Sequence, residues 1–355
     1  MNPLQLQQDL LLRYARYLIT RAGLRRPALK TAVKEMLLDQ GVLTRDAWIE
    51  ALPDYRQTIP LKDIQVNGRP WLFEEFTNVV YQPKENDRRE GFGVSWSLYP
   101  HQEEAIRAFA DDKNVIVASG TGSGKTECFL IPIINDLLEN PRHPGETGIR
   151  TLILYPMNAL VNNQVDRLRD WLSPQTEGQI RISFAFYTSR TPKKDIPKTA
   201  QQPSAELGNR ICIRATPPDI LITNYSMLSY ALMRSEDVAL FGPGLRHIVI
   251  DEGHVYTGAL ATEIMMLLRH LLKRCTRSTA DVKFIITSAT LTNRQQPLTE
   301  QRQGLRSFAS GLTTTPAEHW TAIQGVQTTT KPTTRNSSYR PGIALTASLA
   351  RAGLD

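Results

Sequence analysis

Six short apolar runs, rich in β-branched residues, alternate with longer amphipathic stretches and constrain the fold more than any other feature. The runs read NVIVAS, TLILYP, RISFAFY, DILITNY, HIVIDE and VKFIITSA. Strands that are apolar along nearly their whole length belong to parallel sheets that helices cover on both faces. The alternation therefore predicts an α/β fold, with a parallel sheet between two layers of helices.

The chain divides by pattern into three parts. Residues 1–95 are predicted to form a mostly helical accessory region, because apolar residues recur at helical spacing near the start and PALKTAVKEMLLDQ reads as a second helix. Residues 96–325 contain the predicted sheet. Residues 326–355 have the polar composition of a linker or tail. Five arginines between residues 13 and 26 fit either a phosphate backbone or a solvated helix face.

Composition and charge exclude several classes of protein. With 355 residues, 41% hydrophobic and 22% charged, the chain can bury a full core. No apolar run approaches the roughly 18 to 20 residues of a membrane span, and the start, MNPLQLQQDLLLRY, lacks the features of a signal peptide. We therefore expect a cytoplasmic protein with no membrane partner.

The cysteines and the net charge say less about function. Cys128, Cys212 and Cys275 are far apart, with no C-x-x-C pair, so we expect buried free thiols and no zinc in this chain. The formal net charge of +7 suits a polyanionic partner such as nucleic acid, although charge alone decides nothing.

A glycine-rich loop follows the first apolar run and precedes a helical stretch. In that context, glycines allow backbone N–H groups to converge on phosphate oxygens at a helix N-terminus. Lys125 is then expected against the β and γ phosphates of ATP, and the Thr126 hydroxyl on Mg²⁺. The strict pattern has glycine where this chain has Ser119. The predicted cofactor-binding loop consists of Gly120, Thr121, Gly122, Ser123, Gly124, Lys125 and Thr126.

Two carboxylates end a later apolar run, HIVI, and supply the second half of a predicted RecA-like nucleotide site. Asp251 is expected to hold the Mg²⁺ shell with Thr126, and Glu252 to orient and deprotonate the attacking water. The last run ends in Ser288, with Thr290 two residues further on. His254 is predicted to be catalytic together with Lys125, Asp251 and Glu252, and the two hydroxyl residues are placed to hydrogen-bond toward it and sense the nucleotide.

In this order, G-T-G-S-G-K-T, D-E-G-H and S-A-T resemble motifs I, II and III of the DEAD/DEAH-box superfamily 2 helicases, over roughly residues 98–292. L-Y-P-H-Q before the glycine-rich loop resembles the Q motif. That resemblance implies that Gln102 reads the adenine edge; a helix-surface residue is the alternative. D-E-G-H departs from the family pattern, because Gly253 stands where the family has alanine.

Two further loops resemble motifs that hold the sugar-phosphate backbone in this family. P-M-N-A-L, with a glutamine further on, resembles motif Ia, and T-P-P followed by T-N-Y resembles the motif Ib region. Ordinary helix caps are the alternative reading of each loop. The residues so assigned to nucleic acid are Pro156, Asn158, Gln164, Thr216, Pro217, Thr223 and Asn224.

Within the superfamily, YPHQEEAI, ASGTGSGKTE and LILYPMNALVNNQ look most like the large bacterial MrfA-like DNA helicases, some of which act in phage defence. That resemblance implies the ATP-binding lobe of an ATP-dependent helicase or translocase, with DNA favoured over RNA. No strand and helix series is predicted after residue 292, so a second RecA lobe is absent from the prediction. The chain is then expected to be a truncated or split motor. The alternatives are a non-enzymatic, nucleotide-gated nucleic-acid-binding subunit, which a partner chain completes, and an inactive gene remnant.

Overall fold

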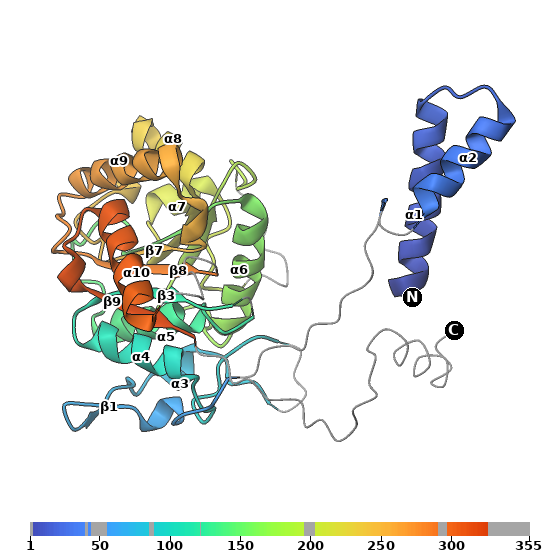
Figure 1. Ribbon diagram of the computed structural model, residues 1–355. Coiled ribbons are helices and arrows are strands. Elements are labelled where there is room, and N and C mark those ends of the chain that lie inside the picture. Colours follow the sequence, from blue (N-terminus) through green and yellow to red (C-terminus); the bar gives the residue numbers. More distant parts are fainter. Residues whose placement is uncertain are drawn as a thin grey trace, which may run out of the picture. The chain divides into compact units, whose positions relative to one another are not determined.

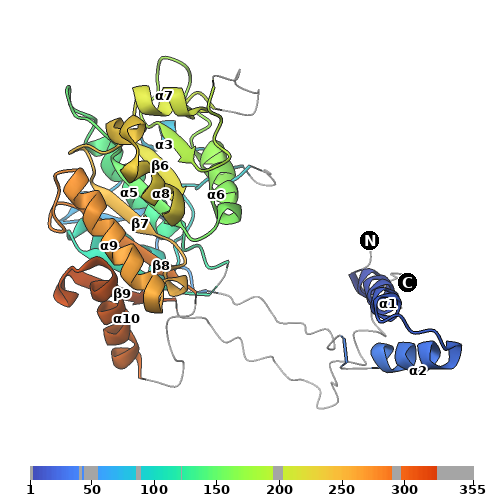
Figure 2. The same ribbon diagram turned by 90° about the horizontal axis from the view of Figure 1, so that it is seen from above.

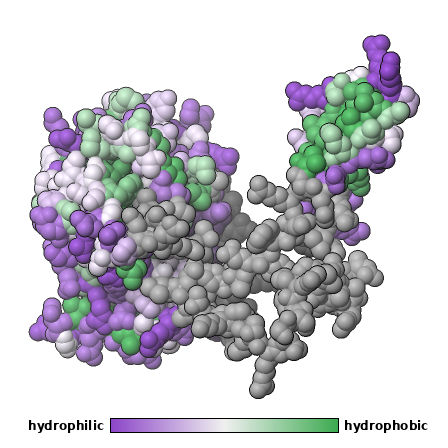
Figure 3. Space-filling view, in the orientation of Figure 1, coloured by the Kyte–Doolittle hydropathy of each residue, from purple (hydrophilic) through white to green (hydrophobic). Residues whose placement is uncertain are grey.

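The computed structural model describes residues 3–39, 42–43, 55–84, 89–120, 122–194, 203–289 and 297–325. They fall into two compact units, one at the N-terminus and one that begins at Tyr55. The first contains two helices, α1 (Pro3–Arg21) and α2 (Pro27–Leu38). Leu10, Tyr14 and Tyr17 of α1 are about half exposed, and Figure 3 shows hydrophobic side chains gathered on the visible face of this unit.

The second unit is built on one seven-stranded sheet in which every neighbouring pair of strands is parallel (Figure 1). The strand order is β5-β6-β4-β7-β8-β3-β9. The α/β, RecA-like fold predicted from the sequence is confirmed. The strands are β3 (Asn114–Ala118), β4 (Thr151–Tyr155), β5 (Phe184–Tyr187), β6 (Ile220–Asn224), β7 (His247–Ile250), β8 (Lys283–Ser288) and β9 (Trp320–Gln324).

Helices cover both faces of the sheet, which explains why the strands are apolar on both sides. Alternate strand residues enter opposite cores: Val115 and Val117 face one layer, and Ile116 faces the other. Figure 1 shows α4 and α5 below the sheet and α8 and α9 above it, and Figure 2 looks onto the upper layer. The first layer contains α4 (Pro100–Ala110), α5 (Glu127–Glu139) and α6 (Asn158–Trp171); the second contains α7 (Arg210–Ala215), α8 (Tyr225–Met233), α9 (Gly258–Arg274) and α10 (Leu298–Thr313).

Strand β9 and helix α10 correct the expectation that no strand and helix series follows residue 292. Both belong to the first sheet: β9 pairs with β3 along its whole length, and Trp320 is buried against α10's layer. The sequence WTAIQ contains a single β-branched aliphatic residue and two polar ones, so it did not read as a buried strand. It is an edge strand, and edge strands need less apolar sequence.

The described part of residues 55–95 also differs from its prediction as a separate helical region. It packs on the sheet unit, and Leu61, Phe76 and Phe92 lie in the same core as α4 and α5. Its apolar residues are irregularly spaced, because this segment is held by long-range contacts and not by one apolar helix face. For example, Tyr81 N–H donates to Trp171 O at 2.7 Å. Its elements are η1 (Leu61–Asp63), the antiparallel pair β1 (Gln65–Val66) and β2 (Arg69–Pro70), and α3 (Phe76–Val79).

The remaining short elements are the 3₁₀ turns η2 (Ser235–Leu240), η3 (Gly253–Val255) and η4 (Ala317–His319). Cys128 and Cys275 are buried free thiols, whereas Cys212 is a half-buried one. Among the described helices, none combines the length and apolar character that a membrane span needs. The predicted tail at 326–355 lies outside the described residues.

Candidate nucleotide-binding site

The predicted nucleotide residues meet at the carboxyl edge of three adjacent strands, β7, β8 and β3. The glycine-rich loop follows β3, Asp251 and Glu252 follow β7, and Ser288 ends β8. Parallel strands place the ends of all three on the same edge of the sheet. A cavity of about 690 Å³ opens there, lined by the loop from Gly122 to Glu127, by Gln102, Gln164, Arg167, Asp251 and Glu252, and by Gln57, Phe92, Trp96 and Tyr99.

In this structure the side chain of Lys125 is hydrogen-bonded to backbone carbonyls at the start of the glycine-rich loop. Gly122 and Gly124 have φ angles of 71° and 74°, in the left-handed region that glycine adopts most readily. Lys125 Nζ donates to Ser119 O at 2.9 Å and to Gly120 O at 3.2 Å. Phosphate oxygens in the loop would compete with these two carbonyls for the ammonium group. Thr121 lies outside the described residues.

Gln102 is held under the loop, so the helix-surface reading of this residue is wrong. Its side chain is 3% exposed, Tyr99 N–H donates to its Oε1 at 2.9 Å, and its Nε2 donates to Gly124 O at 3.1 Å. A Cβ atom at position 124 would lie 2.3 Å from Gln102 Nε2 and would displace this amide, and the φ of 74° at Gly124 also favours glycine. The amide therefore connects the start of α4 to the phosphate loop.

Tyr55 and His101 contact the glycine-rich loop and the residue before it, although sequence reasoning did not single them out. The hydroxyl oxygens of Tyr55 and Ser119 lie 3.3 Å apart, and His101 Nε2–H donates to Ser123 O at 2.7 Å. Burial lowers the pKa of His101 despite this hydrogen bond, so the ring is neutral around pH 7. The Tyr55 and His101 rings are 5.2 Å apart. Ser119, which replaces a glycine of the strict pattern, thus has a hydroxyl partner.

The carboxylate pair sits on a tight turn after β7. Asp251 is 8% exposed, and burial raises its pKa, while a hydrogen bond from the Thr287 hydroxyl to Asp251 Oδ1 opposes that shift. Glu252 has a φ of 52°, a left-handed conformation unusual for a residue with a side chain. His254 Nδ1 lies 3.3 Å from Glu252 Oε2 and 3.4 Å from Ser288 Oγ. The latter is the contact expected from the sequence; Thr290 lies outside the described residues.

The glycine in D-E-G-H has a steric cause in this chain. A Cβ atom at Gly253 would lie 2.7 Å from Ile286 Cγ2, far inside van der Waals contact. Ile286 is fully buried in β8, where the core restricts its movement. Glycine in place of the family's alanine is therefore explained by the close approach of Ile286 on the neighbouring strand β8. The substitution does not alter the two carboxylates that precede it.

Two asparagines predicted to contact nucleic acid come together on neighbouring strand ends. Asn224 ends β6, Asn158 follows β4, and Asn224 Nδ2 donates to Asn158 Oδ1 at 2.5 Å. Asn224 also caps α8, since its Oδ1 accepts from Met227 N at 2.8 Å. The Thr223 hydroxyl is buried and donates to Tyr187 O at 2.5 Å, so it is engaged within the fold. Pro156 directly follows β4.

Three other residues of that predicted set lie elsewhere. Gln164 lines the nucleotide cavity. Thr216 and Pro217 precede β6, so they lie at the amino edge of the parallel sheet, opposite the carboxyl edge that carries Asn158. Arg142 Nη2 donates to Pro217 O at 3.4 Å on that edge. The T-P-P stretch is thus a connection into a strand, and its assignment to the nucleic-acid loops is corrected.

A phosphate loop and a strand-terminal acid pair on one edge of a RecA-like sheet define a P-loop NTPase lobe. Residues 99–298 match the model of the DEAD/DEAH box helicase family, which is more than half of the chain. The chain belongs to the DEAD/DEAH box helicase family, as the sequence motifs had indicated.

Two curated proteins are similar to this chain over most of its length. Druantia protein DruE of Escherichia coli is 26% identical over 83% of this chain and 21% of its own length. The uncharacterized ATP-dependent helicase MJ1574 of Methanocaldococcus jannaschii is 30% identical over 69% of this chain and 33% of its own. The chain therefore spans about a fifth to a third of these relatives.

A solved structure shares the fold. The crystal structure of the DUF1998 helicase MrfA bound to DNA has a TM-score of 0.51 and 24% identity, and the likeness covers 79% of this chain and 33% of that one. At this level of identity the likeness supports the RecA-like fold alone.

Proposed function

We propose that this chain is the ATP-binding lobe of a motor that uses ATP hydrolysis to move along or unwind nucleic acid, with DNA favoured over RNA. The observation that carries the proposal is the single cavity in which Lys125, Thr126, Asp251 and Glu252 meet. A cation, a hydroxyl and two carboxylates around one cavity are the groups that phosphoryl transfer to water requires. MJ1574 and other relatives are named ATP-dependent helicases.

The residues present fit a magnesium ion bound together with ATP. Mg²⁺ takes oxygen ligands and is usually held by one or two protein side chains, with phosphates and water completing the shell. The Asp251 carboxylate and the Thr126 hydroxyl line the same cavity and supply that small donor set. A bound cation also offsets the burial that raises the pKa of Asp251. Glu252, beside it, is the proposed base for the attacking water.

The nucleic-acid side of the proposal rests on Asn158 and Asn224. Their amides pair at the carboxyl ends of β4 and β6, on the same sheet edge as the nucleotide cavity. Small polar groups at such loops can hold the sugar-phosphate backbone without reading base sequence. DNA is favoured because the sequence resembles the MrfA-like helicases and because the MrfA structure contains DNA.

A second candidate is a nucleotide-gated nucleic-acid-binding subunit that another lobe or a partner chain completes. In the part of the chain that the structure describes, the cations lining the cavity are Lys125 and Arg167. Arg167 is engaged with Glu90 at 2.5 Å and Glu127 at 3.4 Å. The charge on the γ-phosphate would therefore need a further cation, such as an arginine finger from a second lobe.

Nucleic-acid-stimulated ATP hydrolysis tests the proposal. We would measure turnover for this chain alone and with a homologous second RecA lobe added in cis or in trans, expecting a gain of at least about 10³-fold. Glu252→Gln, carried through the same assay, should abolish the gain. Nucleotide-dependent DNA binding without any gain in turnover would favour the second candidate. A chain that alone turns over ATP at roughly 1 s⁻¹ and unwinds a tailed duplex would contradict the need for added charge.

A further inference from the structure

A second cavity, of about 580 Å³, lies beside the edge strand β5 and is lined by four basic side chains. Lys193 comes from the segment after β5, Arg210 and Arg214 from α7, and Arg234 directly follows α8. We propose that this basic pocket binds a backbone phosphate of single-stranded nucleic acid. The inference rests on the proposed motor function and extends its nucleic-acid contacts beyond Asn158 and Asn224.

The charges in the basic pocket are only partly neutralised. Arg214 is paired, because its Nε lies 2.7 Å from the buried carboxylate of Asp237 and its Nη1 lies 3.0 Å from Glu236. Among the described residues, no carboxylate lies within ion-pair distance of Lys193, Arg210 or Arg234. Three cations that have no counter-ion among the described residues, around one cavity, create a site that favours an anion.

Arg210 is a buried arginine without a counter-ion among the described residues. Its side chain is 7% exposed, and its Nη2 donates to Thr188 O at 3.0 Å, yet its buried Nε has no partner in the described structure. Arg150, the other arginine buried to this degree in the described ranges, also has a buried Nε without a hydrogen-bond partner, but its guanidinium lies 3.5 Å from Glu146 and 3.7 Å from Asp219. A buried guanidinium is normally paired, since leaving it without an anion is costly. Arg210 is therefore poised for an anion from outside the chain.

The segment that shapes the basic pocket is fixed by its own hydrogen bonds. Thr191 Oγ1 accepts from Thr188 N at 2.9 Å and donates to Phe186 O at 3.0 Å. Arg210 N donates to Pro192 O at 2.9 Å, which ties the start of α7 to the same segment. Because these hydrogen bonds already order the segment, less conformational entropy is lost when an anion binds.

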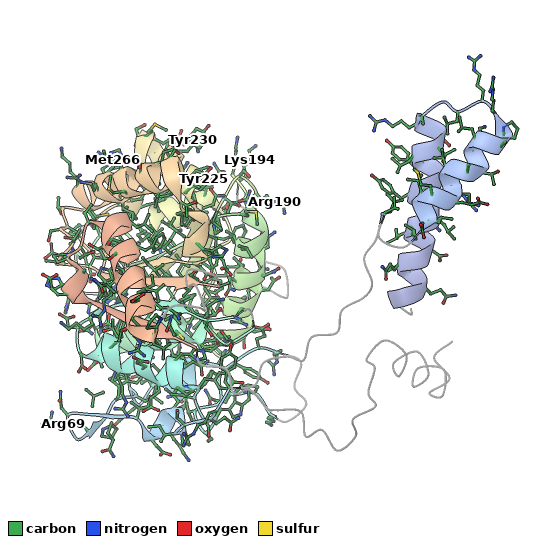
Figure 4. The ribbon with its side chains drawn as sticks, viewed as in Figure 1. Arg69, Arg190, Lys194, Tyr225, Tyr230 and Met266 are labelled. Carbon is green, nitrogen blue, oxygen red and sulfur yellow. The ribbon has the colours of Figure 1, made fainter. Side chains whose placement is uncertain are left out.

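The surroundings of the basic pocket fit a polymer better than a free phosphate ion. Arg190 and Lys194, labelled in Figure 4, are exposed on the same segment and extend the positive charge beyond the cavity. On the other side, Met233 lines both this cavity and an adjoining one that contains Tyr230. Tyr230 is 57% exposed, and an exposed aromatic ring beside a basic groove is a platform on which bases stack.

The test uses the full chain with two alanine substitutions in the basic pocket, Lys193→Ala together with Arg234→Ala. The matched control removes two charges that are also exposed, Lys62→Ala in η1 together with Arg69→Ala in β2; Arg69 is labelled in Figure 4. Binding of a fluorescent oligothymidylate is measured over a range of salt concentrations. The pocket variant should bind at least about fivefold more weakly than the control, and its salt slope should fall by about 0.7, the value for one lost phosphate contact on a single strand.

Three outcomes would overturn the inference, and each is separable from failure of the motor proposal. In the first, the pocket variant matches the control in affinity and slope while the wild type still binds the oligonucleotide. In the second, the wild type does not bind the oligonucleotide at all. In the third, inorganic phosphate at constant ionic strength raises the melting temperature of the wild type but not of the pocket variant, with oligonucleotide affinity unchanged, which would assign the pocket to free phosphate. Failure of the motor proposal is read independently, from ATP turnover with the second lobe present.

Discussion

The hydroxyl of Thr287 donates a hydrogen bond to Oδ1 of Asp251, so strand β8 holds the carboxylate that ends the neighbouring strand β7. Both side chains are buried, and Thr287 has no exposed surface. Burial raises the pKa of Asp251, and the hydrogen bond from Thr287 favours the ionised form that Mg²⁺ needs. Thr287, the residue before S-A-T, therefore positions Asp251 of D-E-G-H and stabilises its ionised form.

Replacing Thr287 with valine should keep the shape and remove the donor. The pKa of Asp251 should then rise further, so nucleotide binding with Mg²⁺ should weaken by roughly 10- to 100-fold and fail at a higher pH than in the wild type. Calorimetric titration with Mg-ATP from neutral to mildly acidic pH measures this. Thr313→Val, a buried threonine in α10, is the control and should leave ATP affinity unchanged. Identical pH profiles for Thr287→Val and the wild type would contradict the role given to Thr287.

Asp251 should also destabilise the protein when no nucleotide is bound. Because its folded pKa is raised, stability is lost as the pH rises from the ordinary aspartate value of about 3.9 through the raised value. Asp251→Asn should therefore raise the melting temperature at neutral pH, and the gain should fade on acidification. Asp281 is the contrast, since hydrogen bonds from Ser278 lower its pKa. Asp281→Asn should not raise the melting temperature. A higher melting temperature for Asp281→Asn, with no increase for Asp251→Asn, would contradict the destabilising role given to Asp251.

The glycine of D-E-G-H should be sterically required. Gly253→Ala places a Cβ 2.7 Å from Ile286 Cγ2 and should destabilise the fold by about 1–3 kcal/mol. Gly304→Ala in α10 is the matched control, because a Cβ there meets nothing within 4 Å and should stabilise the helix by about 0.5–1 kcal/mol. Chemical denaturation of both variants measures the two free energies. Equal stability of Gly253→Ala and the wild type would mean that β8 yields at Ile286.

Local sequence predicted the parts of the fold that local physics determines. The six predicted runs became β3 to β8, since a strand buried on both faces must be apolar throughout. Strand β9 escaped notice because an edge position tolerates the polar residues of WTAIQ. The packing of Leu61 and Phe76 onto the sheet was also missed, because it depends on contacts far along the chain.

The site shows the same division. Lys125 and Asp251 carry spacing signals, since each follows an apolar strand and the ends of parallel strands meet. Tyr55 contacts Ser119 across 64 residues, and Thr287 contacts Asp251 across 36, so no local pattern marks either. Thr216 precedes β6 and therefore lies at the amino edge of the sheet, which the short motif resemblance did not take into account.

Single-stranded DNA should bind weakly and with strong salt dependence. One lobe supplies only part of the contacts to the nucleic-acid backbone, so we expect a dissociation constant no lower than about micromolar at physiological salt. The affinity should fall steeply as the salt concentration rises. Fluorescence anisotropy with several unrelated oligonucleotides should give similar values, because phosphate contacts carry no sequence information. Tight binding that ignores salt or depends on sequence would indicate a different surface.

The central claim is that the cavity at the carboxyl edge binds ATP through Lys125 and hydrolyses it through Glu252. Calorimetric titration of ATP into the wild type, Lys125→Ala and Glu252→Gln tests it most directly. We expect Lys125→Ala to lose ATP binding, because the cation against the β and γ phosphates is gone, whereas Glu252→Gln should bind ATP as the wild type does and fail only in turnover. Equal ATP affinity in Lys125→Ala and the wild type would contradict it.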